Sequence, residues 1–226
     1  MSEPESIKVV LLGESGVGKT SIITQFTSGT FDPHRQTSLS AQFVSKTLEF
    51  PDLGQSLKFD IWDTVGQEKY RSLAKIFYKD AKVIIFVYDV TREFSFEGIQ
   101  NYWYKETSEN WDGKPILALV GNKIDLYNDL KVSNNDGKEF ANKIGAIFQT
   151  TSALSNSGIS NLFENIGKTY LVPGYDYQSQ DKKAQEEFMK KKLEETGKKD
   201  KKKTTQKGVK LEDAKKPAGK NGGCCK

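Results

Sequence analysis

Apolar and polar residues alternate along the first 173 residues in blocks of two kinds. Short apolar runs, typical of buried strands, cover residues 7–12, 83–88 and 116–120, and residues 58–62 alternate between polar and apolar side chains as in a strand. Longer stretches with apolar residues at helical spacing cover residues 18–27, 68–79, 94–111, 134–144 and 159–171. This alternation favours an α/β fold in which helices cover both faces of a mostly parallel sheet, expected here to have six strands. Ligands of such sheets bind at the carboxyl ends of the strands.

The character of the sequence changes near residue 173. The 226 residues are 36% hydrophobic, enough to bury one sizeable core. Although the whole chain has a formal net charge of +4, residues 174–226 contain sixteen lysines against nine acidic residues, so the basic excess lies there. The few apolar residues of this segment cannot offset its chain entropy. We therefore expect one domain over residues 6–173 and a disordered, lysine-rich tail over residues 174–226.

The chain has no feature that predicts export or a membrane span. No stretch approaches 18 apolar residues, and the first six residues are short and acidic. Both cysteines, Cys224 and Cys225, stand side by side near the end, where they cannot cross-link a fold, and no His or Cys lies at metal-ligand spacing. We expect synthesis in the cytosol, with thiol chemistry at these cysteines or none.

The stretch Gly13–Ser21, GESGVGKTS, follows the first predicted strand and begins the first predicted helix. Its G-x-x-x-x-G-K-T spacing in this context predicts the phosphate-binding loop of a P-loop NTPase, whereas the glycine spacing excludes a dinucleotide fingerprint. Backbone N–H groups would surround the β-phosphate, Lys19 would supply a charge to the β- and γ-phosphates, and the Thr20 hydroxyl would ligate Mg²⁺. The candidate nucleotide-binding residues of this loop are Glu14, Ser15, Gly16, Val17, Gly18, Lys19, Thr20 and Ser21.

A second motif, Gly121–Asp125, ends another buried strand with the sequence GNKID. A carboxylate at Asp125 can accept hydrogen bonds from N1–H and the 2-amino group of guanine, and adenine lacks this pair of donors. Asn122 would brace the loop, and the stem of Lys123 would lie along the base. Asn and Asp are also ordinary residues of a strand-to-helix turn. Together with the P-loop, however, the motif predicts guanine recognition.

The third motif, Asp63–Glu68, follows an alternating strand with the sequence DTVGQE. Asp63 is placed to hold Mg²⁺ through water, and Gly66 can bring its N–H against the γ-phosphate because it has no Cβ. Gln67, with both a donor and an acceptor, suits the orientation of the attacking water and is the candidate catalytic residue.

Over residues 6–173 and at the C-terminus the sequence resembles the small GTPases of the Ras superfamily, most closely the Rab family. The runs IWDTVGQEKYRSL (61–73), FYKDA (77–81) and VYDVT (87–91) are similar to the segments that distinguish Rabs from Ras and Rho proteins, and no Rho-type insert follows Asp125. By resemblance, Ser152, Ala153 and Leu154 belong to the last guanine-contacting loop, and Phe31 packs edge-on against guanine.

The resemblance implies a slow GTP hydrolase that binds GTP or GDP with Mg²⁺ and acts as a switch in intracellular vesicle trafficking. Ser38 and Gly66 would tether two loops to the γ-phosphate, and effectors would contact an aromatic surface of Phe43, Trp62 and Tyr78. These aromatics, Trp62 above all, could instead belong to the core. The implied protein partners are an exchange factor, an activating protein that supplies an arginine, a GDP-dissociation inhibitor or escort protein, and effectors.

Three residues depart from the family pattern. Ser38, a candidate Mg²⁺ ligand, stands where a threonine is usual, and Thr37 next to it could compete for the role. Val65 replaces an alanine beside the γ-phosphate, which we expect to alter hydrolysis, and Leu154 replaces a lysine, which we expect to lower nucleotide affinity. These departures keep open a second function, a scaffold that binds GTP and effectors but hardly hydrolyses GTP; Gln67 argues against it.

The end of the chain resembles the double-cysteine ends of Rabs, in which Cys224 and Cys225 would each accept a geranylgeranyl group. Two lipid groups and the preceding lysines favour attachment to the cytoplasmic face of an intracellular membrane. The run of residues 67–74 is loosely similar to the endosomal branch of Rabs, and a Ras-like plasma-membrane protein is disfavoured. Nucleic-acid binding is not expected, since the lysines lack interleaved aromatics and a recognition fold. The default oligomeric state is a monomer.

Overall fold

The computed structural model describes residues 4–34, 41–64, 77–111 and 113–177. The chain divides into two units, residues 1–177 and 178–226, and all described residues belong to the first. Several predicted positions lie outside the described residues. They are Ser38, Val65, Gly66, Gln67, Cys224 and Cys225.

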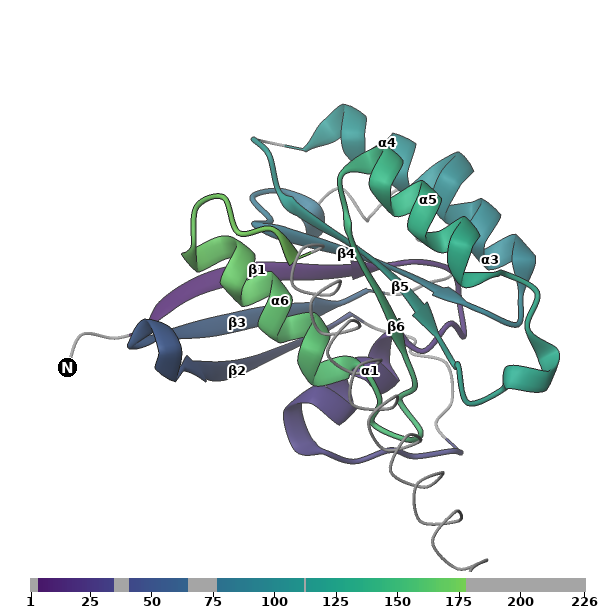
Figure 1. Ribbon diagram of the computed structural model, residues 1–226, viewed down its shortest axis with the longest axis horizontal. Coiled ribbons are helices and arrows are strands. Elements are labelled where there is room, and N and C mark those ends of the chain that lie inside the picture. Colours follow the sequence, from purple (N-terminus) through teal and green to yellow (C-terminus); the bar gives the residue numbers. More distant parts are fainter. Residues whose placement is uncertain (1–3, 35–40, 65–76, 112, 178–226) are drawn as a thin grey trace, which may run out of the picture. The chain divides into compact units, whose positions relative to one another are not determined.

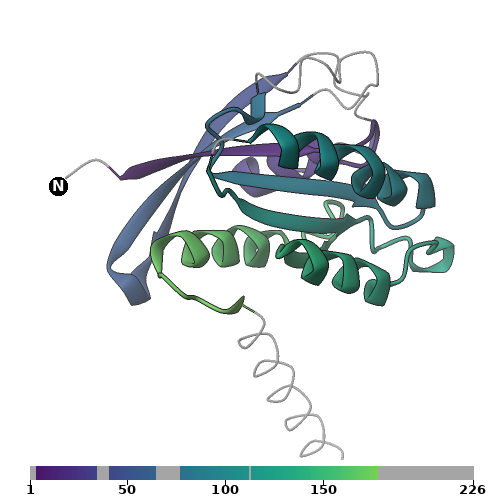
Figure 2. The same ribbon diagram turned by 90° about the horizontal axis from the view of Figure 1, so that it is seen from above.

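The described residues form the predicted α/β fold around a six-stranded sheet with the strand order β2-β3-β1-β4-β5-β6 (Figure 1). Five strands run parallel, and β2 is antiparallel to its neighbour β3. The strands are β1 (Glu5–Leu12), β2 (Gln42–Phe50), β3 (Gln55–Asp63), β4 (Val83–Asp89), β5 (Ile116–Asn122) and β6 (Ile147–Thr151). A turn of 3-10 helix at Pro51–Leu53 closes the long β2–β3 hairpin seen in Figure 2.

Helices cover both faces of the sheet. The core between α1, α6 and the sheet contains Ile22 and Phe163, whereas the core on the other face contains Phe96 and Phe140 from α3 and α5. Figure 1 shows α5 beside α3 and α4 on this second face. The helices are α1 (Lys19–Ser28), α3 (Glu93–Gly98), α4 (Tyr104–Asn110), α5 (Asn134–Ile144) and α6 (Ile159–Leu171), with a 3-10 turn at Tyr127–Asp129.

The helix expected over residues 94–111 is not continuously α-helical. Between α3 and α4 the five residues Ile99–Trp103 form a π-helical turn. Such turns are rare and widen the helix locally. The turn ends at Trp103, which is buried and whose Nε1 donates to Oε1 of Glu14 at 3.1 Å. The π-turn is therefore next to a residue of the P-loop.

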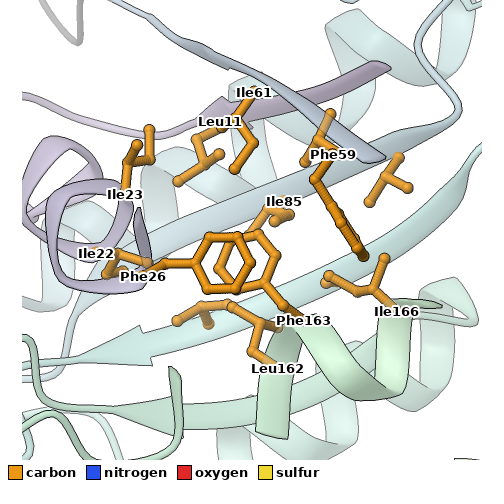
Figure 3. Close-up of a cluster of buried hydrophobic side chains, with 14 of the residues drawn as sticks. Leu11, Ile22, Ile23, Phe26, Phe59, Ile61, Ile85, Leu162, Phe163 and Ile166 are labelled. Atoms are coloured by element: carbon orange, nitrogen blue, oxygen red, sulfur yellow. The ribbon is translucent and has the colours of Figure 1, made fainter. Parts of the chain in front are cut away.

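Three phenylalanines are at the centre of the first core. The rings of Phe26 and Phe163 stack with their centroids 3.6 Å apart, and Phe59 meets both edge-on at 6.1 and 5.7 Å (Figure 3). Aromatic side chains bury large apolar areas, and edge-to-face pairs add about 0.5–1.5 kcal/mol each. This cluster joins α1, β3 and α6, and so anchors the helix that follows the P-loop.

Gly167 in α6 tests how closely this core is packed. A Cβ at Gly167 would lie 2.2 Å from Cζ of Phe50, which is itself buried. Gly167→Ala should therefore destabilise the protein by about 1–3 kcal/mol, because overpacking outweighs the gain in helix propensity. The measurement is the free energy of unfolding in urea. Ser160→Ala, on the exposed side of the same helix, is the control and should be neutral or slightly stabilising. Stabilisation by Gly167→Ala would contradict the packing argument.

Candidate nucleotide-binding site

The P-loop connects β1 to α1. At two of its positions the backbone lies so close to neighbouring strands that only glycine fits. Gly13 has φ +147°, and a Cβ there would lie 2.2 Å from the carbonyl oxygen of Val87 in β4. Gly18 has φ +100°, and its Cβ would lie 2.3 Å from Nδ2 of Asn122 at the end of β5. Any side chain at either position would push the loop away from the neighbouring strands.

A cavity of about 330 Å³ opens at this edge of the sheet, a volume in the range of small-molecule sites. Twelve of the predicted residues line it: Ser15, Gly16, Gly18, Lys19, Thr20, Ser21, Phe31, Asn122, Lys123, Asp125, Ala153 and Leu154. Residues from the P-loop, the β5 end and the β6 end therefore share one cavity, as expected from the carboxyl ends of parallel strands.

Sequence reasoning missed four lining residues, which are Asp32, Pro33, Thr64 and Leu126. Thr64 lies inside the DTVGQE motif, and Asp32 and Leu126 directly follow Phe31 and Asp125. Pro33 comes next after Asp32, so proximity in sequence was the available signal. Thr64 also has a structural role, since its Oγ1 donates to the carbonyl of Leu11 in β1 at 2.6 Å.

Three predicted residues stand behind the cavity wall. Val17 and Ser152 are both fully buried. Glu14 points to Trp103, as described above, and its carboxylate also lies against Gly98 of α3, where a Cβ would be 2.8 Å from Oε1. Their side chains therefore support the loops rather than line the cavity.

Asn122 and Asp125 are held by hydrogen bonds that link the loops. Nδ2 of Asn122 donates to the carbonyl of Val17 at 2.9 Å, and Oδ1 of Asn122 accepts from Oγ1 of Thr151 at 3.1 Å. Asp125 accepts from Oγ of Ser152 at 2.5 Å. The side chains thus tie the P-loop to the ends of β5 and β6, and they fix the carboxylate that faces the cavity.

Lys19 is nearly buried at the bottom of the P-loop, with 6% of its surface exposed. Its Nζ donates to the carbonyls of Gly13 at 2.8 Å and Glu14 at 3.0 Å. Burial lowers the pKa of Lys19 to about 8, although the negative charges of Asp63 and Glu14 partly oppose this. An anion in the cavity would therefore raise the pKa of Lys19 and favour its charged ammonium form.

Thr20 and Asp63 meet beside the P-loop and offer a donor set that suits magnesium. Oγ1 of Thr20 donates to Oδ2 of Asp63 at 2.5 Å, and Asp63 is 2% exposed. Hydroxyl and carboxylate oxygens are ligands that Mg²⁺ accepts, with phosphates and waters completing its octahedron. Within the described ranges no group of three or more His, Cys, Asp or Glu could hold a metal, so further ligands would come from the nucleotide, water or residues such as Ser38 outside those ranges.

The sequence is similar to known proteins over the length of this domain. Residues 8–172 match the model of the Ras family. The chain is 40% identical to the Ras-related protein Rab-22A of Homo sapiens over 170 residues, which cover 75% of this chain and 85% of that protein. It is 42% identical to Rab-21 of Geodia cydonium over 164 residues (73% and 70%) and 38% identical to RabC of Dictyostelium discoideum over 164 residues (73% and 83%).

The chain is a Rab-family small GTPase. As a member of this family it binds guanine nucleotide and hydrolyses GTP. The cavity between the P-loop and the GNKID motif is the candidate site for that nucleotide.

The aromatic surface of this Rab differs from the predicted one by one residue. Phe43 is 55% exposed, and its ring centroid lies 5.2 Å from that of Trp62, which lies 6.1 Å from Phe77. Tyr78 is only 2% exposed and belongs to the second core, where burial raises its pKa to about 12. The prediction that Tyr78 lies on this surface is therefore wrong, and Phe77 occupies the place. Neighbouring helical residues point about 100° apart, so an error of one residue exchanges surface for core.

The pKa of Lys19 gives a pH dependence to nucleotide binding. Phosphates favour the charged ammonium and raise its pKa in the complex above about 8, so binding is fully supported below that pH and weakens as the pH rises through it. Affinity for GDP should fall by up to about tenfold per pH unit above pH 8. Equilibrium competition with a fluorescent GDP analogue between about pH 7 and 9 measures this change in affinity.

Two variants separate Lys19 from other titrating groups. Lys19→Arg keeps its charge throughout this range and should remove most of the pH dependence at whatever affinity remains. Lys105→Gln, at an exposed position of α4, should leave the dependence unchanged. An affinity of the unmodified protein that stays flat across this range would contradict the assignment.

Proposed function

We propose that this Rab is a membrane-anchored switch that recruits effectors for vesicle trafficking while it holds GTP and releases them after hydrolysis. The observation that carries the proposal is that one cavity brings together the base-reading carboxylate of Asp125 and the phosphate-binding Lys19, with Thr20 and Asp63 beside it. These residues come from three separate segments of the sequence. A cavity with both ends formed in this way suits a purine nucleotide with a phosphate chain.

At the base end, Asp125 selects guanine. Its carboxylate, held by Ser152, would accept from N1–H and the 2-amino group of the base. Adenine would leave this half-buried carboxylate without these two donors, which costs about 1–3 kcal/mol. Phe31, Leu126 and Leu154 add apolar walls around the base.

At the phosphate end, the P-loop and Lys19 bind the negative charge. Backbone N–H groups of the loop and the N-terminus of α1 favour the β-phosphate, and Lys19 favours the β- and γ-phosphates. Thr20 and Asp63, with Ser38, would hold the magnesium ion, and the ion when bound neutralises charge that develops on the phosphates. This arrangement positions the γ-phosphate for attack by water.

Hydrolysis by this chain alone should be slow. Gln67 would orient the attacking water, and Gly66 and Ser38 would follow the γ-phosphate, all three outside the described residues. Of the arginines, Arg92 alone lies in the described ranges, and it does not line the cavity. An activating protein that contributes an arginine would therefore accelerate the reaction. An exchange factor would reload the site, and effectors would contact Phe43, Trp62 and Phe77.

The tail supplies the proposed membrane attachment. No helix of the described residues is long and apolar enough to cross a membrane. Geranylgeranyl groups on Cys224 and Cys225, with the lysines of the tail, would hold the protein on the cytoplasmic face of an intracellular membrane. The loose similarity of residues 67–74 to the endosomal branch of Rabs favours an endosomal membrane. A GDP-dissociation inhibitor or escort protein would cover the lipids during return through the cytosol.

Single-turnover hydrolysis separates this switch from a scaffold that stays loaded. Purified protein loaded with GTP and Mg²⁺ should release phosphate slowly but measurably, with no binding of ATP. Val65→Ala removes two methyl groups beside the γ-phosphate and should change the rate several-fold, whereas Gln67→Leu should lower it roughly tenfold or more. Tight GTP binding with no phosphate above the buffer rate would favour the scaffold, and equal use of ATP would refute guanine selection.

The two cysteines determine the strength of membrane attachment. After treatment with geranylgeranyl diphosphate and the transferase system, mass spectrometry should show two added groups. The protein should then sediment with vesicles that contain anionic lipid. Cys224→Ser and Cys225→Ser should each leave weak, reversible binding, and the double variant should remain in the supernatant. Sedimentation of the double variant, or a mass that shows no added group on the intact chain, would contradict the proposal.

A further inference from the structure

Asp89, at the end of β4, has a buried carboxylate that forms ion pairs with two basic side chains. It is 1% exposed, its Oδ2 lies 3.0 Å from Nε of Arg92 and 2.6 Å from Nζ of Lys123, and its Oδ1 accepts from the backbone N–H and hydroxyl of Thr91. Burial acts to raise the pKa of Asp89, but hydrogen bonds from Lys123 and Thr91 outweigh it and hold the pKa below its usual value. The carboxylate therefore stays ionised at neutral pH, where both cations can pair with it.

The same two cations also contact the P-loop. Nη2 of Arg92 donates to the carbonyl of Ser15 at 3.3 Å, and Nζ of Lys123 donates to the carbonyl of Gly16 at 2.8 Å. A Cβ at Gly16 would lie 3.1 Å from Nη2 of Arg92, so the guanidinium packs against the loop as well as bonding to it. Arg92 and Lys123 thus link the consecutive carbonyls of Ser15 and Gly16 to one buried carboxylate, that of Asp89.

The Arg92 contact is made from outside the cavity. Ser15, Gly16 and Lys123 line the nucleotide cavity, but Arg92 and Asp89 do not. A P-loop binds phosphate by turning its N–H groups inward. A donor that engages the carbonyls from outside holds the peptide groups in the orientation that phosphate binding needs. The ring centroid of Phe94 lies 5.4 Å from the guanidinium carbon of Arg92, within the range of a cation–π contact.

We propose that Arg92 is a positioning residue which, with Asp89 and Lys123, clamps the P-loop at Ser15 and Gly16 and thereby slows the release of guanine nucleotide. The proposal rests on the nucleotide binding of the site described above. It assigns no contact between Arg92 and the nucleotide. It also joins the two ends of the site, because Lys123 belongs to the GNKID motif that carries Asp125.

The chemistry of the clamp requires an arginine at this position. Arg92 uses Nε for Asp89 and Nη2 for Ser15, two donors of one planar group that point in fixed directions. A lysine could reach one of these acceptors but not both in the same geometry. The chain contains only three arginines, Arg35, Arg71 and Arg92, among its 34 basic residues, so the guanidinium is an unusual choice in this protein.

The test is the dissociation rate of a fluorescent GDP analogue, measured with Mg²⁺ and an excess of unlabelled GDP. Arg92→Gln should release the analogue roughly tenfold faster, the factor that corresponds to about 1.4 kcal/mol. The association rate should stay within about twofold, because the docking surface of the nucleotide is unchanged. Arg92→Lys should restore only part of the difference. Lys105→Gln, which removes one exposed positive charge from α4, is the control and should release at the original rate.

Each other outcome has a distinct meaning. Equal dissociation rates for Arg92→Gln and the unmodified protein would overturn the clamp, and so would equal acceleration by Lys105→Gln. An association rate reduced as strongly as dissociation is raised, together with a lower melting temperature of the nucleotide-free protein, would indicate a general folding defect and also overturn it. If the unmodified protein retained no GDP, the nucleotide-binding function itself would fail, and the clamp with it.

Discussion

The structure depends on how closely the P-loop backbone approaches the strands beside it. Gly13 and Gly18 leave no room for a Cβ against Val87 and Asn122, so the loop rests directly on the ends of β4 and β5. The contact brings the loop within reach of side chains that would otherwise be too distant to bond its carbonyls. From this approach follow the Asn122 brace, the Lys123 contact and the position of Lys19 at the bottom of the cavity.

Buried charges at this edge are tolerated because each has a defined partner. Asp89 is compensated by Arg92 and Lys123, and Lys19 is held by backbone carbonyls near Asp63. An isolated buried charge would be expensive, and removing one partner would leave the other uncompensated. The charged groups therefore also fix loop geometry, since each can be satisfied only when the loops adopt this arrangement.

Much of the fold and of the site could be predicted because the relevant signals are local. Helices over 134–144 and 159–171 coincide with α5 and α6, and the P-loop and GNKID motifs do line one cavity. Strand β2 was missed because its alternating side chains are mostly exposed or half-buried and form no continuous apolar run. The π-turn was missed because the spacing of apolar residues does not distinguish it from an α-helix. Tyr78 was assigned to the aromatic surface in place of Phe77 because a shift of one position within a helix exchanges a surface residue for a core residue.

Arg92 shows what local signals omit altogether. It stands outside every motif, and its acceptor on the P-loop is 77 positions earlier in the chain. Its role becomes visible only when the sheet places the end of β4 beside the loop that follows β1, a pairing set by residues such as Leu11 and Ile85 deep in the core. The motifs identify which groups can touch a nucleotide. How long a nucleotide stays depends also on what holds those groups in place, and that is determined by packing between segments far apart in sequence.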